Sequence, residues 1–184
     1  MLTYILVAVV AIVIVLFAVV AMQPSDFRVE RKAVLPAPPA DVFANVADLH
    51  KWLAWSPWER VDPDLQRTYS GPDVGKGASY AWLGNKNVGE GRMTITECRP
   101  NDLIRIKLEF LKPFKATNTA EFTFQPQGDN QTQVTWSMYG LKNFFAKAMH
   151  LVISMDKMCG GEFEMGLTNL RAVVADAPTA IPAS

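Results

Sequence analysis

The stretch Asn143–Ala175, NFFAKAMHLVISMDKMCGGEFEMGLTNLRAVVA, has the longest helical pattern outside the apolar N-terminus. Its apolar residues recur every three or four positions, or at their sum, and so share one stripe of a helix. The stripe comprises Phe145, Met149, Val152, Cys159, Phe163, Leu167, Leu170 and Val174. With Asn143 as N-cap, about 31 helical residues give a rod of roughly 46 Å, which matches the width of a curved sheet. We therefore expect a sheet that wraps this helix.

Strand patterns fill most of the chain before this helix. A first strand at Phe27–Leu35 ends at prolines, and two short helices are expected at Asp41–Val46 and Asp48–Trp55. A meander follows, with turn residues between its strands. These strands are expected at Leu65–Ser70, Ala78–Leu83, Val88–Cys98, Leu103–Leu111, Thr117–Gln125 and Thr132–Tyr139. The predicted fold class is α+β, with about seven antiparallel strands curved around one long C-terminal helix.

The N-terminal run Leu2–Met22 is interrupted only by Thr3 and Tyr4, and as a helix it would span roughly 31 Å, the thickness of a bilayer core. A cleaved signal peptide is the alternative, but the run has no basic leader and exceeds the apolar length of such signals. Basic residues follow the run and none precedes it, which predicts a single-pass cell-membrane protein with a cytoplasmic domain. The basic residues are Arg28, Arg31 and Lys32. The predicted parts are a transmembrane helix (1–22), a linker (23–26), a folded domain (27–175) and a flexible tail (176–184).

Composition narrows the classes of partner. Lys+Arg and Asp+Glu both number 18 among 184 residues, so no net positive charge attracts a phosphate backbone and no nucleic-acid partner is expected. Cys98 and Cys159 are too few to staple a domain and are expected to be free thiols. Because His50 and His150 show no ligand spacing to them, we expect neither a metal nor another cofactor. The oligomeric state is left open.

Strand alternation sorts residues into an apolar inner face and a polar outer face. Ile104, Ile106, Leu108 and Phe110 share one side of their strand and are expected to face the long helix. Whether the interior is a filled core or a cavity for a small hydrophobic ligand is left open, with a cavity preferred. Glycines at 160, 161 and 166 indicate a close backbone approach or a bend in the helix. The residues expected to line a cavity are Trp55, Tyr80, Trp82, Phe122, Trp136, Met138 and Phe163.

Polar residues near this interior are weak candidates for catalysis. Asp156 occupies a stripe position, where it either lies in the pocket or turns to solvent while Met155 packs instead. His50 would act as a general acid or base only if it pointed into the cavity mouth. Glu162 and Glu164 are expected to be surface charges. The glycine-rich loop Gly71–Gly77 lacks the Ser or Thr of a phosphate loop and leads into a strand, so it is assigned to a hairpin.

Three tryptophans lie close together in Trp52–Trp58, WLAWSPW, at the expected open end of the sheet. Two interpretations are open. The rings form either a gate to the cavity or a plug that completes the core.

The order of elements, together with five sequence segments, resembles the helix-grip fold of the START-like superfamily. These segments are Val29–Arg31, Pro36–Phe43, Trp52–Trp58, Gly71–Gly77 and Gly161–Leu167, and they resemble the SRPBCC, or polyketide cyclase/dehydrase-like, proteins. The birch pollen allergen belongs to the same superfamily. The resemblance implies a hydrophobic pocket for lipids, sterols or polyketides, and in some members cyclisation or dehydration, but no shared catalytic set.

The N-terminal apolar helix is unlike the soluble cyclases and favours a ligand that lives in or near the bilayer. The preferred hypothesis is a membrane-anchored domain that binds a lipid-like molecule. The alternatives are an enzyme of the cyclase or dehydratase type and a tethered scaffold with a filled core.

Overall fold

The computed structural model describes residues 1–151 and 154–176. The N-terminal helix α1 (Leu2–Met22) is followed by one strand, four short helical segments, six strands and two final helices. The helical segments are α2 (Pro39–Ala47), η1 (Leu49–Lys51), α3 (Trp52–Trp55) and η2 (Pro57–Arg60). The strands are β1 (Asp26–Leu35), β2 (Gln66–Ser70), β3 (Ser79–Leu83), β4 (Glu90–Arg99), β5 (Leu103–Lys112), β6 (Ala116–Pro126) and β7 (Thr132–Leu141), and the final helices are α4 (Phe144–His150) and α5 (Met155–Asp176).

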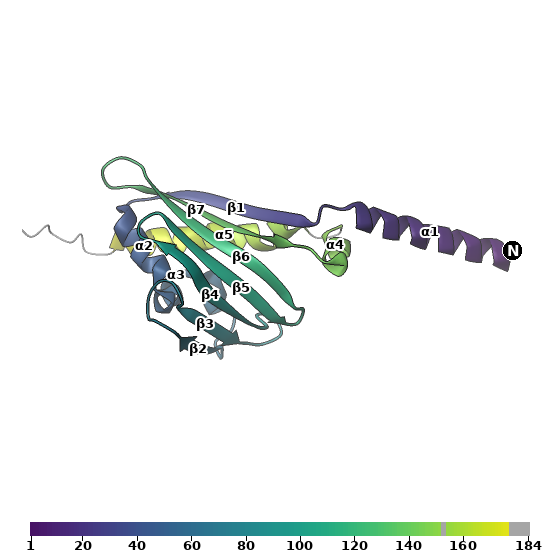
Figure 1. The fold of residues 1–184 in the computed structure, drawn as a ribbon, viewed down its shortest axis with the longest axis horizontal. Helices are drawn as coiled ribbons and strands as arrows, with labels where there is room; N and C mark the ends of the chain where they lie inside the picture. The colour runs from purple at the N-terminus through teal and green to yellow at the C-terminus, as the bar shows by residue number, and fades with distance from the viewer. Residues whose placement is uncertain (152–153, 177–184) are drawn as a thin grey trace, which may run out of the picture.

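The seven strands form one antiparallel sheet in the order β1-β7-β6-β5-β4-β3-β2. Only β1 is out of sequence, because it pairs with β7 along its whole length, from Asp26 opposite Leu141 to Leu35 opposite Thr132. Figure 1 shows α5 running along one face of the curved sheet, while α2 and α3 lie at the end remote from α1. The predicted sheet wrapped around a C-terminal helix is confirmed, and each strand begins and ends within two residues of its predicted bounds.

The core lies between the inner face of the sheet and α5. Ile104 and Ile106 on β5 and Leu167 and Leu170 on α5 are buried in one hydrophobic cluster. The outer face carries charged side chains, such as Arg92, whose guanidinium donates a 2.8 Å hydrogen bond to Glu109. Strand alternation therefore assigned the two faces correctly, because side chains on a pleated strand point alternately to either side.

The long C-terminal helix is not continuous, which corrects the prediction. Its pattern is divided between α4 and α5, and Ser154 caps the second helix by accepting a 3.2 Å hydrogen bond from the Lys157 backbone N–H. Asn143 caps α4 as predicted, accepting from the Ala146 N–H at 2.8 Å. Phe145 and Met149 of the predicted stripe are exposed on α4, so the buried stripe begins only on α5.

Two other expected segments also differ. The predicted helix Asp48–Trp55 is a 3-10 turn followed by the four-residue α3, because the Asp48 side chain caps the turn at the His50 N–H. The segment η2 was not anticipated. Val152 of the predicted stripe and residues 177–184 of the predicted tail lie outside the described residues, and α5 ends at Asp176.

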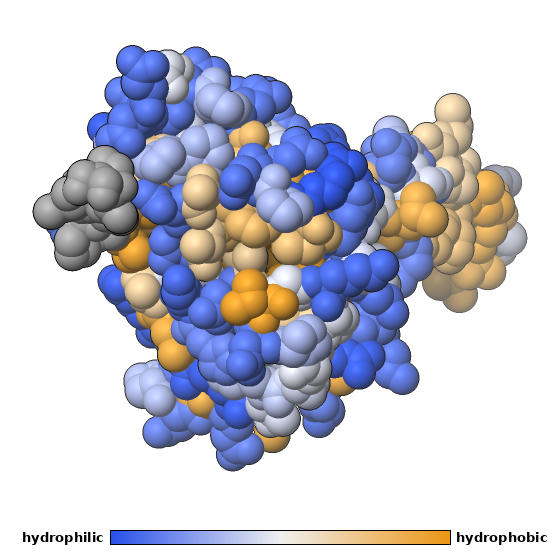
Figure 2. All heavy atoms as spheres, turned by 60° about the vertical axis from the view of Figure 1, so that its left-hand side comes forward, coloured by the Kyte–Doolittle hydropathy of each residue, from blue (hydrophilic) through white to orange (hydrophobic). Residues whose placement is uncertain are grey.

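Helix α1 has 21 residues and is apolar and long enough to cross a membrane, a property that an N-terminal signal sequence shares. Its side chains are exposed except that of Val20. It meets the domain at α4, where the Phe17 and Phe144 rings stack at 5.1 Å. Figure 2 shows apolar atoms covering α1, at the right of the view, whereas hydrophilic atoms cover most of the domain around a smaller apolar patch.

Candidate functional site

The residues that were expected to line a cavity meet one another inside the domain. Trp136 stacks on Phe163 of α5 at 4.3 Å between ring centroids and on Phe122 of β6 at 4.8 Å. The ring centroids of Tyr80 and Trp82, both on β3, lie 6.1 Å apart. All seven are buried: Trp55, Tyr80, Trp82, Phe122, Trp136, Met138 and Phe163. Aromatic rings therefore fill the space between β6, β7 and the middle of α5.

The three tryptophans of the segment Trp52–Trp58 form a plug. The Trp52 indole N–H donates to the Val46 carbonyl at 3.0 Å, and that of Trp55 donates to the Asn45 carbonyl at 3.1 Å. These bonds satisfy the one polar atom of each ring, so Trp55 can lie at 0% exposure. Trp58 is half-buried and meets Trp136 edge to face at 5.7 Å. The interior at this end is closed.

Two of the helix glycines make room for neighbouring side chains. At Gly166 a Cβ atom would lie 2.6 Å from the Trp136 ring, and at Gly160 it would overlap the guanidinium of Arg31. A Cβ at Gly161 would meet nothing within 4 Å. The predicted close approach is thus confirmed for Gly160 and Gly166.

Asp156 lies at the surface of α5, where it pairs with Arg31 of β1. The guanidinium donates to its carboxylate at 2.7 and 3.2 Å, and also to Glu164. The hydrogen bond from Arg31 holds the pKa of Asp156 below its ordinary value, and the bonds to Asp156 and then Glu164 raise that of Arg31. Because the Asp156 side chain is 60% exposed and Met155 packs against the core, the solvent-facing alternative is the one observed.

A polar cluster that sequence reasoning missed lies at the β2–β3 side of the interior. The Glu59 carboxylate, only 6% exposed, accepts hydrogen bonds from Arg67 Nε at 2.7 Å and from the Tyr80 hydroxyl at 2.8 Å. Burial, and then the bond to Glu59, raise the pKa of Tyr80. No local motif announces this cluster, because Glu59 lies on η2 and its partners on β2 and β3. It holds a compensated buried charge beside the rings.

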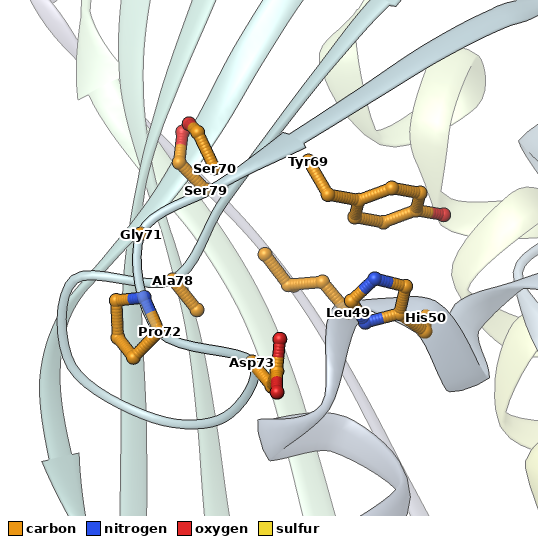
Figure 3. Close-up of a pocket in the computed structure, with 9 residues that line it drawn as sticks. All are labelled: Leu49, His50, Tyr69, Ser70, Gly71, Pro72, Asp73, Ala78 and Ser79. Carbon is orange, nitrogen blue, oxygen red and sulfur yellow. The ribbon is translucent and has the colours of Figure 1, made fainter.

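His50 lies in a small surface hollow of about 80 Å³ between η1 and the start of β3. Its Nδ1 atom is 3.2 Å from Asp48 Oδ1, and its ring stacks on Tyr69 at 4.0 Å. Figure 3 shows the two rings face to face, with Asp73 near the imidazole and Ser79 at some distance. Ser79 donates its hydroxyl to the Met93 carbonyl, and Ser70 also lines the hollow. The side chain of His150 lies outside the described residues.

The interior loses burial toward the end that carries α1. Along β5, Ile104 and Ile106 are buried, whereas Leu108 and Phe110 on the same face are only half-buried. The stripe of α5 behaves alike, since Phe163 is buried but Cys159 and Met155, one and two turns earlier, are half-buried. Next to Phe110, residues of the β5–β6 hairpin line a hollow of about 290 Å³ that is open to solvent. Its lining residues are Glu109, Phe110, Leu111, Lys115, Ala116 and Thr117.

Solved structures share this architecture. Truncated norcoclaurine synthase from Thalictrum flavum superposes with a TM-score of 0.63 at 14% identity, covering 85% of this chain and 99% of that one. A protein from Thermobifida fusca gives 0.60 at 20% identity, with 80% and 93% covered. Aha1 from Colwellia psychrerythraea gives 0.56 at 12%, with 80% and 96% covered. At these identities the likeness concerns the fold alone, and it is the helix-grip fold.

Sequence comparison adds the family. No curated protein matches the chain. A family model described as "Polyketide cyclase / dehydrase and lipid transport" matches residues 26–175, which include every strand of the sheet and all but the last residue of α5. Since that match spans most of the chain, and the sheet and helix it covers have the helix-grip arrangement, the protein belongs to the polyketide cyclase / dehydrase and lipid transport family.

Proposed function

We propose that this protein is a membrane-anchored domain that binds a hydrophobic or amphipathic, lipid-like molecule at the end of its interior nearest α1. The observation that carries the proposal is the gradient of burial along β5 and α5. The rings close the remote end, while Leu108, Phe110 and Met155 are apolar inner-face residues left half-buried at the α1 end. These side chains pack against the core on one side and stay partly exposed on the other, and apolar surface left in this way favours an apolar ligand.

The position of α1 supports a ligand taken from the bilayer. Helix α1 leaves the domain at the start of β1, where β7 ends and α4 begins (Figure 1). The linker Gln23–Ser25 is so short that even fully extended it reaches only about 10 Å. If α1 spans the membrane, the half-buried end of the interior lies next to the lipid surface. Because Arg28, Arg31 and Lys32 follow α1, we place the domain on the cytoplasmic side.

Photo-crosslinking tests the binding site. The full chain is reconstituted into phosphatidylcholine nanodiscs that contain a diazirine-labelled fatty acid, irradiated and mapped by peptide mass spectrometry. Crosslinks are expected at Leu108, Phe110 and Met155, in addition to α1. Crosslinks confined to α1 and to exposed residues would contradict the proposal.

A matched pair of variants separates binding from chance contact. Met155→Glu places a charge on the half-buried side of the first turn of α5, where an acidic residue also suits the helix N-terminus. Met158→Glu places the same charge on the solvent side of the same helix, at a residue that is 51% exposed. We expect the first variant to lose interior crosslinking about tenfold, equivalent to about 1.4 kcal/mol. Equal crosslinking in both would show that no ligand occupies this space.

A tethered scaffold with a filled core is the second candidate, and the ring cluster around Trp136 favours it. It predicts unlabelled interior peptides in the crosslinking experiment. The cyclase or dehydratase alternative has less support, because Asp156 is engaged with Arg31 at the surface and His50 lies in a hollow outside the ring cluster.

A further inference from the structure

The end of the domain beside α1 carries an apolar surface of unusual composition. Its five residues come from the end of β5, the β5–β6 hairpin, the end of β7 and the start of α4. Exposure runs from 79% at Leu141 and 60% at Phe114 to 44% at Leu111. The rings join the segments, because Phe114 lies 5.4 Å from Phe145. We call this the α4 surface, made of Leu111, Phe114, Leu141, Phe144 and Phe145.

Lysines surround the α4 surface. Lys115 follows Phe114 on the hairpin, Lys142 follows Leu141, and Lys147 lies one turn after Phe144 on α4. None of the ion pairs formed within residues 1–151 and 154–176 includes these three lysines. Asp26, at the start of β1, lies opposite Leu141 and adds one negative charge. Together with the three lysines, it leaves the charge around the α4 surface net positive. Exposed aromatic rings among lysines match the boundary between acyl chains and anionic headgroups.

Helix α1 sets the depth of this surface. Phe144 stacks on Phe17, which lies about 7 Å before the end of α1 at Met22. Lys147 Nζ lies 3.4 Å from the carbonyl of Ala21, close to that end. If α1 spans a bilayer and ends at its surface, the Phe144 ring is level with the outer acyl region and the Lys147 ammonium group with the headgroups. Interfacial helices bury their apolar faces by roughly 5–10 Å, which agrees with this placement.

We propose that the α4 surface docks the domain onto the anionic headgroup layer of the same bilayer that α1 spans. The inference rests on the membrane anchoring in the proposed function, but it does not need a bound ligand. The rings enter the acyl boundary, and Lys115, Lys142 and Lys147 contact lipid phosphates. Docking holds the half-buried end of the interior against the membrane and fixes the orientation of the domain.

Amide hydrogen exchange of the full chain in nanodiscs tests the docking. Discs of phosphatidylcholine alone are compared with discs containing 30% phosphatidylglycerol. Peptides covering 111–116 and 141–149 should exchange more slowly in the anionic discs, and added salt should remove the difference because it screens charge. Each lysine near an anionic surface contributes about a fivefold change in the docking equilibrium, so neutralising three should lower it about 100-fold.

The variants carry a matched charge change. Lys115→Gln/Lys142→Gln/Lys147→Gln should lose the extra protection, whereas Lys51→Gln/Lys76→Gln/Arg171→Gln, three exposed residues outside the α4 surface, should keep it. Fluorescence of the five tryptophans, all outside the α4 surface, checks that each variant is folded. The docking proposal would be overturned if the exchange rates of these peptides were the same with and without anionic lipid, at low and high salt, and in the lysine variants. Loss of interior crosslinking with docking intact would instead overturn the ligand proposal alone.

Discussion

Arg31 on β1 lies across Gly160 on α5, and its guanidinium occupies the space that a side chain at residue 160 would fill. The same group donates hydrogen bonds to the carboxylate of Asp156, to Glu164 and to the Glu30 carbonyl. A single arginine thus ties the edge strand of the sheet to the first turns of the gripping helix. Gly160 is the residue that permits this contact.

Alanine at the two adjacent glycines should therefore have different effects. Gly161→Ala meets no neighbour and should raise the free energy of unfolding by about 1 kcal/mol through helix propensity. Gly160→Ala has the same gain in helix propensity but must displace Arg31 from its exposed ion pairs, which costs up to about 1 kcal/mol. Its free energy of unfolding should therefore change little. Urea unfolding of the full chain in detergent micelles, followed by tryptophan fluorescence, measures both. In an Arg31→Ala background the two substitutions should become equivalent, and a persistent difference would refute the steric explanation.

The two tyrosines of the β2–β3 hairpin offer a second matched pair. Tyr80 donates to the buried Glu59 carboxylate at 2.8 Å, so Tyr80→Phe should lower the free energy of unfolding by about 1.5–3 kcal/mol. The Tyr69 hydroxyl is buried and has no hydrogen-bond partner in the described part of the chain. Tyr69→Phe should therefore be neutral or slightly stabilising. Equal losses in the two variants, by the same unfolding measurement, would show that the Glu59 bond contributes nothing.

Two buried tryptophans differ in the same way. Trp55 donates its indole N–H to the Asn45 carbonyl, whereas the Trp136 Nε1 atom is buried without a partner among the residues that the structure describes. Replacement by Phe removes a similar ring volume at both sites, so the packing cost is similar. Trp55→Phe should destabilise the domain by about 1 kcal/mol more, because it also removes a hydrogen bond. Thermal unfolding followed by near-ultraviolet circular dichroism measures both variants, and equal losses would show that the bond contributes little.

The Arg31–Asp156 pair predicts a stability change in acid. Because the hydrogen bond from Arg31 lowers the pKa of Asp156 in the folded state, the unfolded chain binds the proton more tightly. The contribution of the pair is therefore present above the ordinary carboxyl pKa of about 4 and is lost as the pH falls through the lower folded value. Asp156→Asn should flatten the stability curve as the pH falls below about 5, relative to the unmodified chain. A curve of unchanged slope would contradict this assignment.

The fold was predictable because local patterns carry it. Alternation placed Ile104 and Ile106 on the inner face, and turn residues marked the strand ends. The strands could therefore be predicted without knowing which strands pair with one another. The break between α4 and α5 was not predictable in the same way. The helical spacing of apolar residues continues on both sides of Ser154, so the sequence pattern shows no break there. Only the hydrogen bond by which Ser154 caps α5 shows that a new helix begins.

The candidate site depended on contacts between distant residues. Glu59 meets Tyr80 from 21 positions away, and Arg31 reaches Asp156 from 125 positions away. Neither pair leaves a local motif, because any charged residue on a short helix or edge strand looks like a surface group.

The sequence by itself determined the apolar N-terminal helix, the seven-stranded sheet and the apolar stripe of α5, because periodicity depends only on the order of residues along one chain. Tertiary structure alone decided that the rings around Trp136 fill the remote end of the interior and that burial declines toward α1. The physical reason is that side-chain volume fills a space shared by several elements. How much room remains depends on how closely α5 approaches the sheet, which Gly160 and Gly166 permit and no single segment encodes.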